Sequence, residues 1–196
     1  ASMAAIGTFC HEYSHTMGLP DLYDTDYQTG SYAATLWSST SLMDGGAYNN
    51  NGNTPPYFNA IEREIMQLSK PVLLTTTGKY TIAPIEQGQY YRLDSDNPGE
   101  YFLFECRSLS GWDRYIGGCG MLAYHVDRSM NDAGFSALYN QNVTAADRWG
   151  SGNQVNAFAA HQCADLIEAD GRMDVYSSPY DQTYQNYAQS IQGIFF

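Results

Sequence analysis

The chain has 196 residues, of which 43% are hydrophobic, so it is long and apolar enough to bury the core of a globular domain. Its formal net charge of −12 argues against nucleic acid as a partner, because phosphate contacts need a basic surface. No stretch approaches the roughly 18 to 20 apolar residues that span a bilayer, so we expect no transmembrane segment. A composition rich in tyrosine and asparagine but poor in lysine favours a secreted or cell-surface protein.

The first predicted element is a helix over residues 2–17, which ends at Gly18 and Pro20. Apolar side chains recur in it at helical spacing and predict one buried stripe, formed by Met3, Ile6, Cys10, Tyr13 and Met17. Residues 21–56 have no sustained period, which is typical of a long loop region, and such loops are usually functional. A second helix is predicted at about 57–68, with prolines at its entrance and one apolar face, formed by Phe58, Ile61, Ile65 and Leu68.

From Val72 onward the pattern changes to short β-type runs separated by turn-forming residues. These runs predict an antiparallel sheet or small sandwich, and they read VLLTT, KYTIA, YYRL, EYFLFECR, GMLAYHVD and ADLIEA. The segment 128–160 and the tail after Met173 lack a clear period, so no regular element is predicted there. The expected fold class is α+β. Cys106 and Cys119 lie in consecutive predicted strands and could form a disulfide, with free thiols as the simpler alternative.

The first predicted helix carries the sequence HEYSH, from His11 to His15. Residues four apart lie on the same side of a helix, about one turn apart, so both imidazoles can reach one metal ion. Glu12 can hold a water molecule there without ligating the metal, which completes the HExxH pattern of zinc peptidases. At about 100° per residue the histidines point away from the apolar stripe. We therefore expect the helix to be buried on two sides, by a core and by a metal cleft.

The residues that follow this helix predict a third ligand. Gly18 can adopt a positive φ and reverse the chain, Pro20 prevents the helix from resuming, and Asp21 can then return toward the histidines. Two imidazoles and one carboxylate leave an open tetrahedral position for water, as in catalytic zinc sites. We expect Zn²⁺ to activate this water for attack on a peptide bond, with Glu12 as the general base.

HEYSHTMGLPDLYD, residues 11–24, resembles the immune inhibitor A-like zinc metallopeptidases, a metzincin-related family with the motif HExxHxxGxPDxYD. SLMDGGAYNNNG, residues 41–52, is similar to the Met-turn region of that family, with Met43 as the methionine beneath the metal. The resemblance implies a metzincin-like catalytic C-terminal subdomain over residues 1–70, with the active-site helix, the Met-turn loop and the second helix. It also implies that residues 71–196 form a β-rich segment packed on this subdomain within the same peptidase region, because EYFLFECR, GMLAYHVD and LIEADG resemble the segment that follows the catalytic helix in the family.

The family resemblance further implies a secreted zinc endopeptidase that acts on proteins or peptides, and we expect it to be monomeric. Two departures from the family pattern stand out. An N-terminal subdomain precedes the HExxH helix in the family but not in this sequence, so we expect the chain to be an incomplete fragment of the catalytic domain or a processed product. Gly45 stands where relatives often have a tyrosine, and Tyr48 and Tyr23 are the candidates to supply a phenol that stabilises the transition state.

Several residues have more than one possible role. Glu62 and Glu64 compete with Asp21 as third ligand, because another class of HExxH enzymes takes a glutamate from a downstream helix. Acidic loop residues could bind Ca²⁺ or simply form solvated turns, and those considered are Asp24, Asp26, Asp44, Asn49, Asp127, Glu168 and Asp170. The alternative function is a non-catalytic secreted binding or adhesion module that keeps a metallopeptidase-like fold.

Overall fold

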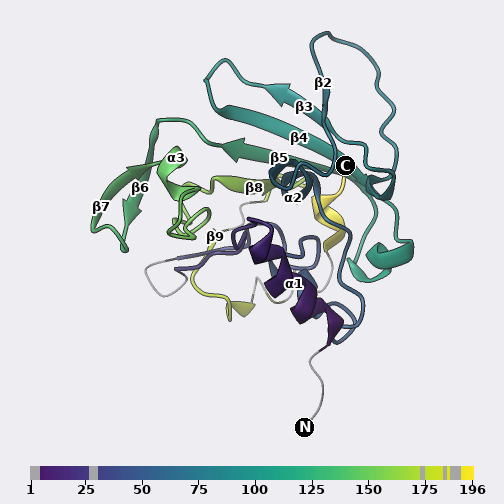
Figure 1. The fold of residues 1–196 in the computed structure, drawn as a ribbon, viewed down its shortest axis with the longest axis horizontal. Helices are drawn as coiled ribbons and strands as arrows, with labels where there is room; N and C mark the ends of the chain where they lie inside the picture. Colours follow the sequence, from purple (N-terminus) through teal and green to yellow (C-terminus); the bar gives the residue numbers. More distant parts are fainter. Residues whose placement is uncertain (1–4, 27–30, 173–174, 183–184, 186–190) are drawn as a thin grey trace.

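The computed structural model describes residues 5–26, 31–172, 175–182, 185 and 191–196. A five-stranded sheet forms the upper layer in Figure 1, helix α1 (Ile6–Thr16) lies below it, and the short helix α2 (Ala60–Ile65) lies between them. In spatial order the strands of this sheet are β2 (Val72–Leu73), β3 (Tyr91–Asp94), β4 (Glu100–Arg107), β5 (Gly120–Asp127) and β8 (Ala164–Ile167). The fold is therefore α+β, as the sequence predicts.

The hairpin of β4 and β5 is the longest pairing in the sheet, and both strands coincide with predicted runs. Burial alternates strictly along β4, which is the period-2 signal that made the strand predictable. The sheet is antiparallel from β3 to β8, whereas β2 runs parallel to β3, so the expectation of a purely antiparallel sheet is wrong at this edge. The run KYTIA is not a strand, because Tyr80 turns back and its hydroxyl donates to the Thr76 carbonyl oxygen at 2.7 Å.

Two regions that lack a sequence period nevertheless form regular elements. The segment expected to be irregular contains the hairpin of β6 (Asp132–Ser136) and β7 (Gln141–Thr144), followed by the short helix α3 (Ala145–Arg148). In the tail, β9 (Val175–Tyr176) pairs antiparallel with β1 (Tyr32–Ala33). The hairpin contains an irregular register and the other pair has only two residues a side, so neither carries a period that a sequence pattern could reveal.

The remaining helices are short. Helix α2 starts later and ends earlier than predicted. Its start is set by Asn59, which forms a reciprocal capping box with Glu62. Ile61 on this helix is buried, but Leu68 lies beyond its end and is 54% exposed, so the predicted apolar face is only partly correct. Short 3₁₀ helices lie at Gly45–Tyr48 (η1), Ile85–Gln87 (η2), Gly111–Tyr115 (η3) and Ile191–Ile194 (η4). No helix within the described ranges is long and apolar enough to cross a membrane.

The predicted orientation of α1 is wrong. Of the expected stripe, Ile6, Tyr13 and Met17 are 46%, 56% and 42% exposed, Cys10 is half-buried, and Met3 lies outside the described residues. The helix instead packs through its small and polar face. A Cβ on Gly7 would lie 2.0 Å from the Ala47 carbonyl oxygen, so this close approach requires glycine. The described residues thus bury the histidine-bearing side of α1 and leave its apolar stripe at the surface.

One buried cluster joins the N-terminal segment to the sheet. It includes Leu22 and Met43 from the long loop region together with Leu103 and Tyr124 from the central strands. Residues before and after position 70 therefore share a core, which fixes the loop region against a rigid layer. The four cysteines are free thiols, so Cys106 and Cys119 are not joined by a disulfide in this structure.

A buried ion-pair network connects the sheet to the loop region. The Arg107 guanidinium is fully buried and contacts the Glu105 and Asp113 carboxylates at 2.6 and 2.9 Å. It also donates to the Thr40 carbonyl oxygen at 3.2 Å, so one side chain of β4 holds the chain just ahead of Met43.

We expect Arg107→Ala to lower the free energy of unfolding by about 3–5 kcal/mol, because it leaves two buried carboxylates without their cation. Arg114→Ala is the matched control, since Arg114 is exposed and donates only to a nearby carbonyl oxygen, and its effect should stay within about 0.5 kcal/mol. Denaturant unfolding of both variants measures the difference. Equal losses in the two variants would contradict the structural role of the network.

Candidate metal centre

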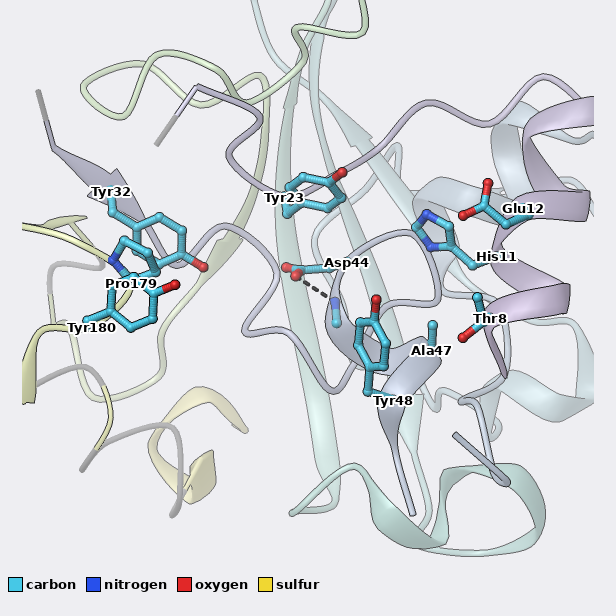
Figure 2. Close-up of a pocket in the computed structure, with 11 residues that line it drawn as sticks. Thr8, His11, Glu12, Tyr23, Tyr32, Asp44, Ala47, Tyr48, Pro179 and Tyr180 are labelled. Atoms are coloured by element: carbon cyan, nitrogen blue, oxygen red, sulfur yellow. Dashed lines mark hydrogen bonds between the residues drawn. The ribbon is translucent and has the colours of Figure 1, made fainter. Parts of the chain in front are cut away.

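Helix α1 presents His11 and Glu12 to a pocket of about 420 Å³. Figure 2 shows both side chains on one side of this pocket, with Tyr23 and Tyr48 also lining it. Tyr48 belongs to η1 and is 72% exposed, whereas Tyr23 comes from the loop after α1. The two phenols considered from the sequence thus lie at the same pocket as the predicted general base.

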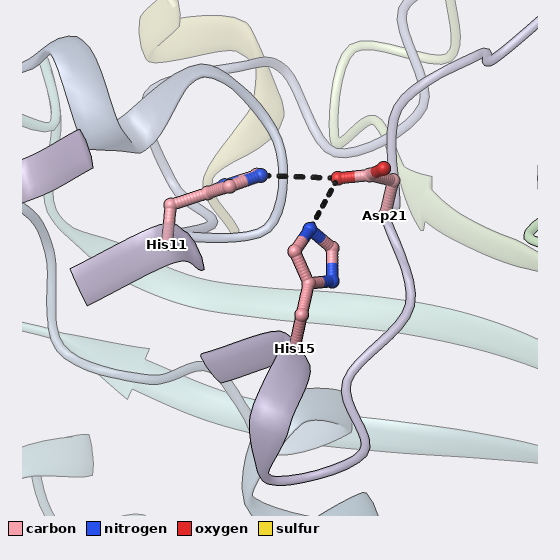
Figure 3. A group of neighbouring side chains, drawn as sticks. All are labelled: His11, His15 and Asp21. Atoms are coloured by element: carbon pink, nitrogen blue, oxygen red, sulfur yellow. Dashed lines mark ion pairs between the residues drawn. The ribbon is translucent and has the colours of Figure 1, made fainter. Parts of the chain in front are cut away.

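His11, His15 and Asp21 converge beside this pocket (Figure 3). Gly18 has φ +92°, the left-handed conformation that the sequence predicts for the turn, and it brings the following residues back toward the helix. The Asp21 Oδ1 atom lies 3.1 Å from His11 Nε2 and 3.4 Å from His15 Nε2. Three side chains from eleven consecutive residues therefore point their polar atoms at one position.

The hydrogen bonds of the two imidazoles fix which nitrogen faces the cluster. His11 Nδ1 lies 2.8 Å from the Leu42 carbonyl oxygen, and His15 Nδ1 lies 2.8 Å from that of Leu19. A carbonyl oxygen only accepts, so each Nδ1 carries a proton and each neutral imidazole turns an Nε2 lone pair toward Asp21. Asp21 Oδ1 is buried and has no hydrogen-bond partner. Lone pairs that face one another in this way are stabilised by a cation between them, either a proton shared by His11 and Asp21 or a metal ion, and two imidazoles with one carboxylate are a donor set that metal sites use.

The charges in this cluster support the same conclusion. The neighbouring Asp21 carboxylate raises the pKa of His11 despite the partial burial of the ring. Burial by itself would raise the pKa of Asp21, but its contacts with His11 and Asn153 outweigh burial and lower it. A negative carboxylate against two imidazoles thus favours any cation at their centre, whether a proton or a metal ion.

Asn153 is a further residue of the site, and it was not expected from the sequence. Its Nδ2 donates to Asp21 Oδ2 at 2.7 Å, and its Oδ1 accepts from the Asp21 backbone nitrogen at 2.8 Å. This pair of contacts holds one carboxylate oxygen and leaves the other turned to the histidines. Asn153 lies in a polar segment without a period and 132 residues from Asp21, so no sequence signal could have indicated it.

The loop that carries Met43 orients His11. Met43 is fully buried, and the residue before it supplies the carbonyl oxygen that accepts from His11. Glu62 holds this loop from α2, because its Oε1 accepts from Ser41 Oγ at 2.6 Å and from the Met43 backbone nitrogen at 2.9 Å. Glu62 therefore lies behind the loop and not among the converging ligand atoms.

The other candidate ligands make different contacts. Glu64 pairs with Arg92 at 3.0 Å and accepts from the Tyr101 hydroxyl, so it too lies outside the cluster. Within the described residues, the only group of three or more histidine, cysteine or acidic side chains whose ligand atoms converge is His11, His15 and Asp21.

The acidic residues considered for calcium are dispersed. Asp24 accepts from the backbone nitrogens of Asp26 and Ala33, at 3.0 and 3.1 Å. Asp127 pairs with His161 at 2.9 Å, and Asp170 pairs with Arg172 at 3.2 Å. The structure therefore brings none of these carboxylates together with a third converging side chain in the part of the chain it describes.

Comparison with known proteins identifies relatives of the N-terminal third. Residues 2–71 match the family profile of the immune inhibitor A peptidase M6 catalytic domain. Immune inhibitor A of Bacillus thuringiensis subsp. alesti is 40% identical over 65 residues, which make up 32% of this chain and 9% of that protein. Pre-pro-metalloprotease PrtV of Vibrio cholerae serotype O1 (strain M66-2) is 35% identical over 68 residues, 34% of this chain and 7% of that protein.

The matched segment thus spans less than a tenth of the length of these curated relatives. No solved structure matches the chain. The profile covers α1, the converging His11, His15 and Asp21, the Met43 loop and α2. Over residues 2–71, the chain is related to the immune inhibitor A peptidases, as its motif predicts.

Proposed function

We propose that this chain carries the catalytic centre of a secreted zinc endopeptidase that hydrolyses peptide bonds in proteins. The observation that supports it best is the convergence of two Nε2 lone pairs and an unpartnered carboxylate oxygen beside a pocket lined by Glu12. Two imidazoles and one carboxylate are a common ligand set of catalytic zinc, which keeps a fourth position open. The names of the matched relatives, a peptidase and a metalloprotease, agree with this chemistry.

Each side chain has a defined role in this proposal. His11, His15 and Asp21 hold the zinc ion, and the Leu42 and Leu19 carbonyl oxygens fix the orientation of the two imidazoles. Zinc, when bound, supplies a Lewis acid that acidifies water and polarises a carbonyl group.

Glu12 accepts the proton of the attacking water and delivers it to the leaving amine nitrogen. The hydroxyl of Tyr48 or of Tyr23 is placed at the pocket to donate a hydrogen bond to the oxygen that becomes negative in the transition state. Met43 keeps the loop behind His11 in place from its buried position.

The direct test combines metal analysis with a protease assay on the purified protein. We expect one zinc ion per chain, cleavage of an unfolded protein substrate, loss of both on treatment with a chelator, and recovery when zinc is returned. Bound zinc without any cleavage would favour the non-catalytic binding module instead. Cleavage that persists after complete metal removal would contradict the zinc mechanism.

Asn153 offers a test of how Asp21 is held. We expect Asn153→Ala to weaken zinc affinity about 10- to 100-fold, because groups that orient a metal ligand typically contribute this much. Asn142→Ala is the control, since Asn142 is exposed and donates to Asp132 on the β6–β7 hairpin. Competition with a zinc-binding dye measures both affinities. Equal affinities would show that Asp21 needs no support from Asn153.

A further inference from the structure

The pocket beside α1 extends well past His11 and Glu12. Figure 2 shows Tyr32, Pro179 and Tyr180 on the side opposite the helix, with the Asp44 carboxylate between them and the Tyr23 and Tyr48 rings. These aromatic residues come from segments far apart in the sequence, since Tyr32 is in β1 and Tyr180 follows β9. The pairing of β1 with β9 therefore builds the far wall of the pocket.

Asp44 has an unusual environment for a carboxylate. It is 8% exposed, and its oxygens accept from the Gly45 backbone nitrogen at 2.6 Å, from Thr35 Oγ1 at 3.0 Å and from the Ser38 backbone nitrogen at 3.2 Å. The Leu36 backbone nitrogen is a further donor to this carboxylate. All of these donors are neutral, and no ion pair to Asp44 occurs among the described residues. Burial raises the pKa of Asp44 to about 6. Buried carboxylates are normally paired with a cation, so this one lacks its usual partner.

The lining of the pocket suits a cationic ligand. Its two formally charged acidic side chains are Glu12 and Asp44, and the described lining contains neither lysine nor arginine. The phenol rings of Tyr32, Tyr48 and Tyr180 offer negative faces on which a guanidinium or ammonium group can stack. The net charge of −12 adds a long-range attraction for basic peptides. The aromatic walls, the uncompensated Asp44 carboxylate and the negative net charge all favour a cationic ligand.

We propose that this pocket is a substrate subsite for a lysine or arginine side chain close to the cleaved bond, with Asp44 as its specificity-determining residue. The inference rests on the proposed peptidase function and adds a substrate class to it. Asp44 supplies the negative charge that attracts the cationic group, and the tyrosines hold the aliphatic stem and the charged head. Arginine should be preferred over lysine, because its planar guanidinium stacks on aromatic rings.

Peptides that differ at one position test the charge directly. Four series carry arginine, lysine, citrulline or leucine at each position around the cleaved bond, and citrulline matches arginine in shape without its charge. With the zinc-loaded protein we expect kcat/KM for arginine to exceed that for citrulline at least about tenfold at one position. Asp44→Asn should bring this ratio close to one. Asp132→Asn is the control, because it removes the same charge from the exposed first residue of β6 and should keep the ratio.

A second variant tests the subsite without removing a buried side chain, so that its effect is not a consequence of unfolding. Tyr180 is 87% exposed, so Tyr180→Ala leaves the buried contacts of Asp44 intact and should lower the arginine-to-citrulline ratio about two- to fivefold, the size of an exposed cation–π contact. Thermal unfolding of each variant establishes that it is folded.

A binding measurement distinguishes failure of the subsite from failure of the peptidase function. Acetyl-arginine amide and acetyl-citrulline amide are titrated into the zinc-loaded protein and followed by NMR. Tighter binding of the arginine compound that depends on Asp44 supports the subsite even if no peptide is cleaved. Cleavage at equal rates for arginine and citrulline peptides overturns the subsite while the peptidase function stands. If the protein neither cleaves the peptides nor binds the arginine compound selectively, both the subsite and the peptidase function are overturned.

Discussion

Glu12→Gln is expected to lower kcat/KM for peptide cleavage by about 10²- to 10⁴-fold, the contribution of a positioned general base. Glutamine keeps the size of the side chain and its hydrogen-bonding reach but cannot accept a proton at neutral pH. Glu12 is not among the three converging side chains, so zinc content should stay at one ion per chain. Initial rates on a peptide substrate, measured alongside the metal content of the same sample, test both halves of this prediction.

Glu86→Gln is the matched control for this substitution. Glu86 belongs to η2, accepts from Ser108 and Ser110 just after β4, and does not line the pocket, so the same chemical change there should leave the rate unaltered. Full activity in Glu12→Gln would show that Glu12 is not the general base. Loss of zinc in Glu12→Gln would instead indicate that Glu12 binds the metal, which the geometry of His11, His15 and Asp21 does not require.

The convergence of His11, His15 and Asp21 could be expected from the sequence because all of its signals are local. His11 and His15 are one turn apart, and the reversal at Gly18 brings Asp21 back within the same short stretch. The β4–β5 hairpin was predictable for a similar reason, since its alternation follows from the pleat of neighbouring residues. The convergence of three side chains and the position of this hairpin could thus be expected from residues close in sequence, whereas the equally local run KYTIA did not form a strand.

Features that depend on distant segments could not be predicted. Asn153 reaches Asp21 across 132 residues, and the far wall of the pocket depends on the two-residue pairing of β1 with β9. The prediction that the apolar stripe of α1 is buried was wrong for a different reason. Helical spacing of apolar residues identifies a stripe, but it does not say what covers it. In this chain the close contact at Gly7 and the hydrogen bond from His11 decide which face packs inward.

Glu62 illustrates why a carboxylate in sequence cannot be assigned from spacing alone. It was a candidate third ligand, yet its two oxygens accept from Ser41, Met43 and the N-cap residue Asn59. It therefore acts through the loop behind His11, and a Glu62 variant would disturb zinc binding and folding together. Glu64, which pairs with Arg92 on the sheet, is the cleaner comparison for identifying the third ligand.

Asp21→Ala is expected to weaken zinc affinity more than about 100-fold, beyond the effect of losing a group that only orients a ligand. The change removes the buried Oδ1 atom on which both histidines converge and leaves two imidazoles as the only protein ligands from this cluster. Glu64→Ala, which also removes one carboxylate, should bind zinc like the unaltered protein. Isothermal titration at one pH measures both.

The cobalt-loaded proteins add a readout that a general loss of stability would not move. Removing Asp21 changes the donor set around the ion, so the visible absorption bands should shift in Asp21→Ala and keep their positions in Glu64→Ala. The opposite pattern, with a shift and weak binding only in Glu64→Ala, would overturn the assignment of Asp21. It would mean that the glutamate on α2 moves to the histidines when metal binds, in spite of its contacts with Arg92 and Tyr101 in the structure.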